Sequence, residues 1–120
     1  MIHILVTRPR LSAEALAEKF VARGLQPVLA PMLAIAPLPD AQAAIDAALR
    51  EQPEILAVTS AHALAALEAA KHVPLYAVGE TTAARARAMG FADVRAAAGD
   101  ALSLVDCIAG AGARKVLYAH

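Results

Sequence analysis

The sequence predicts a three-layer α/β/α fold around a mainly parallel sheet. Strand-like apolar runs alternate with helix-like patterns along the 120 residues, as in folds built from repeated strand-helix units. The run Ile55–Val58 is apolar at every position, which is typical of a parallel strand buried on both faces. Right-handed crossovers would then place helices on both sides of the sheet.

Each element follows from its local pattern. We expect strands at residues 2–6, 27–30, 55–58, 75–78, 94–96 and 115–119. We expect helices at residues 13–23, 41–51, 61–71, 82–89 and 101–109. Alanine, the best helix former, supplies 33 of the 120 residues. Gly24 and Gly90, each followed by a large apolar residue, are predicted to end their helices in the left-handed conformation.

A proline-rich segment divides the chain. Residues 31–40 contain three prolines and no helical period, so we expect an extended crossing segment and a domain boundary near Ala36. Asp40 is expected to cap the helix that follows. Residues 114–120 have the pattern of a buried strand at which the chain stops, so we expect a fold that is cut short. Exposed apolar sheet edges would favour self-association of the chain.

Composition argues against several classes of function. With 11 basic and 11 acidic residues and no basic run, nucleic-acid binding is not expected. No apolar run approaches the length of a membrane span, and no signal peptide is apparent, so the expected location is cytoplasmic. The single cysteine excludes an internal disulfide, and the four histidines lack metal-ligand spacing. No nucleophile elbow, dinucleotide loop or Walker loop occurs.

The candidate chemistry lies where predicted parallel strands end, the usual ligand edge of an open α/β sheet. Three such loops, at residues 7–10, 59–61 and 79–82, place hydroxyls, amides or a guanidinium before a helix, and a fourth would follow His120. A glycine and threonines at a helix start form a receptor for a phosphate or carboxylate. Each group has a simpler alternative. Threonine or serine can cap the helix, Gly79 can serve the turn alone, and Arg8 can be merely solvated.

The order and spacing of several segments resemble the uroporphyrinogen-III synthase family. The segments are residues 4–9, Gly24, 31–37, 56–60, 76–83, 90–91, 99–104 and 116–118. The resemblance implies an enzyme of porphyrin biosynthesis, a lyase. It would close linear hydroxymethylbilane into uroporphyrinogen III, with inversion of the last ring and loss of water, and without metal or organic cofactor.

The same resemblance implies a flavodoxin-like topology in each of two domains, with the active site in the cleft between them. Residues 1–35 would be the N-terminal part of a discontinuous first domain, and residues 36–120 most of the second. The resemblance assigns Thr82 to catalysis, as an aid to departure of the substrate hydroxyl, and Thr59, Ser60 and Gly79 to substrate binding. Arg8, which could pair with a substrate carboxylate through two hydrogen bonds, and Thr81, in the same loop as Gly79, are further candidates for substrate binding.

Members of that family are about twice as long as this chain, so the chain alone is expected to lack activity. A tyrosine that the family places later in the second domain has no counterpart here, and neither Tyr76 nor Tyr118 substitutes for it. The alternative is a non-catalytic, flavodoxin-like ligand-binding or regulatory module. A receiver-type module would need acidic strand ends, whereas this chain has Thr, Ser and Gly there.

Overall fold

A computed structural model describes residues 2–119. The chain forms two compact units, one ending at Pro37 and the other beginning at Leu38. The unit boundary lies within the proline-rich segment. Each unit is described by itself below.

The first unit is a single strand-helix-strand motif. It contains β1 (His3–Val6), α1 (Arg10–Val21) and β2 (Gln26–Leu29), with the two strands paired in parallel. The helix ends as predicted, because Gly24 has a φ of +76° and the amide of Leu25 donates to the carbonyl of Phe20 at 3.0 Å. Helix α1 begins three residues earlier than predicted, directly after Pro9. Pro9 is the N-cap, and its carbonyl accepts a hydrogen bond from the amide of Ala13 at 2.9 Å.

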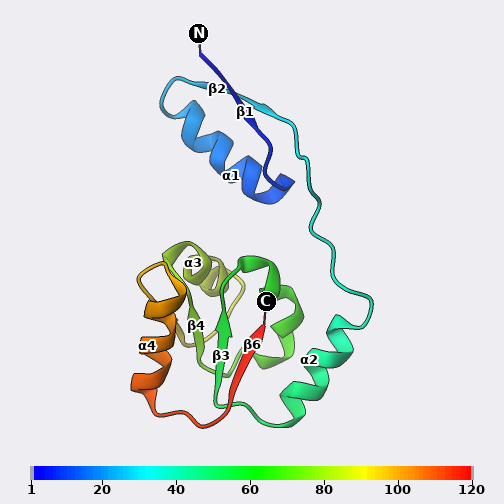
Figure 1. The fold of residues 1–120 in the computed structure, drawn as a ribbon, viewed down its shortest axis with the longest axis vertical. Helices are drawn as coiled ribbons and strands as arrows, with labels where there is room; N and C mark the ends of the chain where they lie inside the picture. Colours follow the sequence, from blue (N-terminus) through cyan, green and yellow to red (C-terminus); the bar gives the residue numbers. More distant parts are fainter. Residues whose placement is uncertain (1, 120) are drawn as a thin grey trace. The chain divides into compact units, whose positions relative to one another are not determined.

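The described residues of the second unit form four strands and four helices. In chain order they are α2 (Ala41–Arg50), β3 (Ile55–Val58), η1 (Ala61–Ala70), β4 (Leu75–Ala77), α3 (Glu80–Ala88), β5 (Val94–Ala96), α4 (Ala101–Ala111) and β6 (Val116–Ala119). All strands pair in parallel in the order β5-β4-β3-β6, so β6 returns to the free side of β3 (Figure 1). This is a doubly wound sheet.

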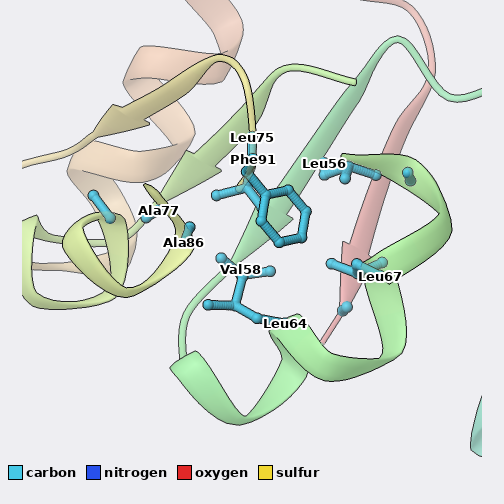
Figure 2. Packing of buried hydrophobic residues seen from close by; sticks show 11 residues of the cluster. Leu56, Val58, Leu64, Leu67, Leu75, Ala77, Ala86 and Phe91 are labelled. Carbon is cyan, nitrogen blue, oxygen red and sulfur yellow. The ribbon is translucent and has the colours of Figure 1, made fainter. Parts of the chain in front are cut away.

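The helices cover the sheet on both faces. One apolar cluster joins β3 and β4 to η1, α3 and α2, with Leu64 and Leu67 of η1 fully buried and Phe91 in its middle (Figure 2). A second, smaller cluster joins Ile55 and Tyr76 on the other face of the sheet to Leu104 of α4. Neighbouring residues of a strand point to opposite faces, so the fully apolar strand β3 contributes side chains to both clusters. The predicted three-layer α/β/α architecture is confirmed.

The helix after β3 differs from the expectation in kind. Residues 61–70 form a 3₁₀ helix, which has three residues per turn. Most 3₁₀ helices are shorter than this one. Its inward-facing residues recur every third position, at Ala61, Leu64, Leu67 and Ala70. A 3₁₀ helix places all four on one line, and its six alanines reduce the crowding between stacked side chains.

Candidate functional site

The loops after β3, β4 and β5 meet at the carboxyl edge of the four-stranded sheet. The amide of Val78 donates to the carbonyl of Val58 at 3.0 Å, and the amide of Gly99 donates to the carbonyl of Val78 at 2.8 Å. These two hydrogen bonds tie the bases of the three loops together. The structure therefore brings Thr59 and Ser60 to the same edge as the segment from Gly79 to Thr82.

Thr59 and Ser60 have different roles in the loop after β3. Ser60 is the N-cap of η1, and its hydroxyl accepts a hydrogen bond from the amide of His62 at 3.3 Å. The capping role that the sequence offered for Ser60 is thus present. Thr59 does not cap this helix. Its Oγ1 lies 3.3 Å from the phenol oxygen of Tyr118, and either group can donate.

The start of α3 differs from the expectation that a threonine caps it. The helix begins at Glu80, the N-cap is Gly79, and no side chain caps the helix. Thr81 and Thr82 lie within its first turn, with Thr81 exposed. Helix formation starts earlier because the carbonyl of Gly79 already accepts the amide of Ala83 at 3.1 Å. The first N–H groups of α3 therefore lack a side-chain acceptor and can face a ligand.

Thr82 is turned toward the core and is 8% exposed. Within residues 2–119, no fully buried side-chain nitrogen or oxygen lacks a hydrogen-bond partner. Ala83 and Ala86 of the same helix are also buried, so Thr82 lies in a largely apolar setting. Glu80, in the same turn, forms an ion pair with Arg87 at 2.6 Å and stands at the positive end of the helix dipole.

Gly79 allows a close approach between two loops and does not serve a left-handed turn. Its φ of −157° and ψ of 178° are extended values that any residue adopts. A Cβ at this position would lie 3.3 Å from the Cα of Gly99, which itself has a φ of +109°. The loops after β4 and β5 thus pack backbone against backbone.

Two polar residues that sequence reasoning did not select, Asp100 and Ser103, order the loop after β5. Asp100 caps α4 by accepting the amide of Ser103 at 2.7 Å, while the Ser103 hydroxyl donates to the Asp100 carbonyl at 3.0 Å. The backbone hydrogen bond, followed by the side-chain hydrogen bond from Ser103, holds the pKa of Asp100 below its ordinary value. The pattern Asp-x-x-Ser before an apolar run was the available signal.

Arg8 lies in the first unit, between β1 and α1, with an exposed side chain. The other five predicted site residues lie in the second unit. Through residues 2–119, no three His, Cys, Asp or Glu side chains are grouped to hold a metal ion, and no helix has the length and apolar character to cross a membrane.

A groove of about 480 Å³ opens elsewhere, beside the segments that lead into β3 and β4, and contains none of the predicted site residues. Its lining includes Leu49, Glu54, His72 and Pro74. It lies at the amino ends of these strands, away from the carboxyl edge where the hydroxyls gather.

Comparison with protein families agrees with the resemblance found in the sequence. The family model of uroporphyrinogen-III synthase HemD matches residues 14–120. A comparison with curated proteins found no match. The matched region includes the whole second unit, with its three hydroxyl- and glycine-bearing strand ends. The chain belongs to the uroporphyrinogen-III synthase HemD family.

Proposed function

We propose that this chain holds hydroxymethylbilane for its closure to uroporphyrinogen III, with inversion of the last ring and loss of water. The observation that carries the proposal is the meeting of the Thr59–Ser60 and Gly79–Thr82 loops at one sheet edge, in a chain of this family. By the same proposal, residues 1–35 belong to a discontinuous first domain and residues 36–120 form most of the second.

Substrate binding would rest on neutral donors at this edge. The substrate is a polycarboxylate, and carboxylates are stabilised by the N–H groups and dipole at a helix start. The uncapped first turn of α3 offers such groups, and Thr59 and Thr81 add hydroxyls. This arrangement can bind several carboxylates although the net charge of the chain is zero. Arg8 is proposed to bind a further carboxylate through two parallel hydrogen bonds.

Thr82 is proposed to assist departure of the substrate hydroxyl. Its own hydroxyl can donate a hydrogen bond to the leaving oxygen. The neighbouring Ala83 and Ala86 are buried, so water competes little for that bond, and a hydrogen bond is stronger in such an apolar setting. The remaining requirement is shape, because the last ring has to be held so that its other carbon atom reacts.

The proposal is tested first by binding. Uroporphyrin III, a stable octacarboxylate tetrapyrrole, serves as the probe in a fluorescence titration of the whole chain. We expect saturable binding that Thr59→Val weakens about threefold to tenfold, the effect of one lost hydrogen bond. Ser12→Ala is the matched control, because this hydroxyl bonds the carbonyl of Pro9 in the first unit.

Product analysis tests the catalytic part of the proposal. Hydroxymethylbilane is incubated either with the native chain or with the Thr82→Val variant. The uroporphyrinogen isomers that form are then separated and quantified. A smaller share of the type III isomer with Thr82→Val is expected where the native sequence forms it. Absence of uroporphyrin III binding by the chain, at any concentration that keeps it folded, would contradict the proposed function.

A further inference from the structure

Two acidic side chains lie at the carboxyl edge of the four-stranded sheet. Residues 59–63, 78–83 and 97–104 form the loops after β3, β4 and β5 and the first turns of the helices that follow. Their acidic residues are Glu80 and Asp100, and none of them is arginine or lysine. Free carboxylates here would repel a substrate that is itself a polycarboxylate. Asp100 is already occupied, because it accepts the amide of Ser103 at 2.7 Å.

Glu80 is bound by an arginine of its own helix. Nη1 of Arg87 lies 2.6 Å from Oε1 of Glu80, although the two residues are seven positions apart in α3. Seven residues correspond to a rise of about 10 Å along the helix axis, so the two side chains extend toward each other along α3. For Glu80 this direction is opposite to the tilt of the Cα–Cβ bonds, which point toward the N-terminus of a helix.

A second contact fixes the guanidinium away from the carboxyl edge. Nη2 of Arg87 donates a hydrogen bond to the carbonyl of Val94 at 3.2 Å. Val94 is the first residue of β5, so it lies at the amino end of that strand. The preceding carbonyl, that of Asp93, accepts the amide of Leu75 in β4, so the carbonyl of Val94 faces the other side of β5. Arg87 is thus anchored below the edge and draws the Glu80 carboxylate toward it.

The first N–H groups of α3 stay unoccupied in this arrangement. No side chain caps the helix, and its hydrogen bonds begin with the amide of Ala83, which donates to the carbonyl of Gly79. A negative charge is favoured beside the preceding N–H groups by the helix dipole. A Glu80 side chain without its partner could turn back toward these groups, where its carboxylate would compete with any anionic ligand.

We infer that Arg87 is a positioning residue, which holds the Glu80 carboxylate away from the first N–H groups of α3 and keeps them free for a substrate carboxylate. The inference rests on the proposed function. Arg87 acts through Glu80 and needs no contact with the substrate. The side chains of Arg87 and Glu80 are 47% and 70% exposed, and an ion pair so open to water contributes little to stability. Its removal is therefore expected to leave the chain folded.

The test compares Arg87→Ala with the control Arg85→Ala in uroporphyrin III titrations of the whole chain. Arg87→Ala is expected to weaken binding about threefold to tenfold, because the released Glu80 charge faces the carboxylates of the probe. Arg85→Ala removes the same charge from the last turn of the same helix, and Arg85 forms no ion pair among the described residues. The control is expected to bind within about twofold of the native chain.

The double variant Glu80→Gln/Arg87→Ala provides a readout that general damage to α3 would not produce. If Arg87 acts by restraining the Glu80 charge, removal of that charge restores binding to within about twofold of the Glu80→Gln variant. The weakening in Arg87→Ala is also expected to shrink between about 0.05 M and 0.5 M salt, because exposed charges are screened. Melting temperatures are measured for all variants, so that a loss of fold is recognised.

Three outcomes overturn the inference and leave the proposed function standing. They are native affinity in Arg87→Ala, equal weakening in Arg85→Ala, and no rescue in the double variant. If Arg87→Ala fails to fold, Arg87→Gln removes the same charge with a longer side chain and takes its place in each comparison. Absence of saturable probe binding by the native chain contradicts the proposed function, and the inference with it.

Discussion

At the scale of single residues, two glycines control how the loops of the candidate site meet. Gly79 and Gly99 lie so close that a Cβ on Gly79 would be 3.3 Å from the Cα of Gly99, and the contacted atom is backbone. Gly110, in α4, has open space around the corresponding position. Alanine substitution at Gly79 can therefore be compared with the same substitution at Gly110, where the added methyl group meets no neighbour.

We expect Gly79→Ala to destabilise the second unit by about 1–3 kcal/mol, because the loop after β5 has to shift to admit the methyl group. Gly110→Ala is expected to stabilise it by about 0.4–1 kcal/mol, since alanine restricts the unfolded chain and favours the helix. Urea unfolding followed by circular dichroism measures both. Equal effects of the two substitutions would show that the loops are not in backbone contact.

The Asp100 cap predicts a pH dependence of stability. The pKa of Asp100 is lowered in the folded chain, chiefly by the hydrogen bond from the Ser103 amide. The unfolded chain therefore binds the Asp100 proton more readily than the folded chain does. The ionised Asp100 cap stabilises the fold fully above the unfolded pKa of about 4, and this stabilisation is lost as the pH falls through the lower folded pKa.

Asp100→Asn keeps an acceptor for the Ser103 amide and removes this titration. We expect the difference in unfolding free energy between the native chain and Asp100→Asn to change in favour of the variant between pH 5 and pH 3. Other carboxylates titrate in both proteins and cancel in the difference. A difference that stays constant over this range would argue against the assigned role of the Asp100 carboxylate.

At the scale of elements, η1 shows how a core selects the type of helix. Its inward-facing residues recur every third position, which suits a 3₁₀ helix, and Leu64 and Leu67 are fully buried against Phe91 and the sheet (Figure 2). In an α-helix the same positions would drift around the axis, because each step of three falls short of a full turn. The packing of η1 therefore depends on this line of side chains.

Leu64→Ala is expected to lower the unfolding free energy by about 2–5 kcal/mol, because it removes a fully buried side chain and leaves a cavity. Leu102→Ala is the control, since Leu102 in the first turn of α4 is 73% exposed and its truncation should change stability by less than about 0.5 kcal/mol. Denaturant midpoints compare the two. A Leu64→Ala chain as stable as the control would refute the proposed packing of η1.

At the scale of the whole molecule, the two units differ in the amount of core they contain. Among the described residues of the first unit, the buried apolar ones are Val6 and Ala13, whereas the second unit holds both apolar clusters. Small units with little buried surface open at low free energy. The units are therefore expected to differ in how often their hydrogen bonds open.

Hydrogen exchange followed by mass spectrometry measures this difference. Amides of β1 and β2 are expected to exchange much faster than amides of β3 and β4, because opening the first unit exposes little apolar surface. Segment 33–38 lies outside the helices and strands, so its amides are expected to exchange rapidly and serve as the reference for unprotected amides. Equal protection of β1 and β3 would mean that the first unit is stabilised to the same extent as the second.

The sequence alone determined the order and kind of most elements, because strand and helix patterns and glycine helix ends are local properties. The apolar run of β3 and the left-handed turns at Gly24 and Gly90 required only neighbouring residues to be predicted. Three features could not be predicted from local sequence, and each depends on tertiary contacts. The period-three packing of η1, the start of α3 at Glu80 and the role of Gly79 depend on residues distant in sequence.

The same division applies to the candidate site. Sequence placed Thr59, Ser60, Gly79, Thr81 and Thr82 at strand ends, and parallel pairing brought those ends to one edge. Only the tertiary structure decided which hydroxyl caps a helix and which one meets Tyr118, since that pair is 59 residues apart and depends on the return of β6 beside β3. Local patterns specify elements, whereas contacts between distant strand ends arise from sheet order and register, which the chain fixes only on folding.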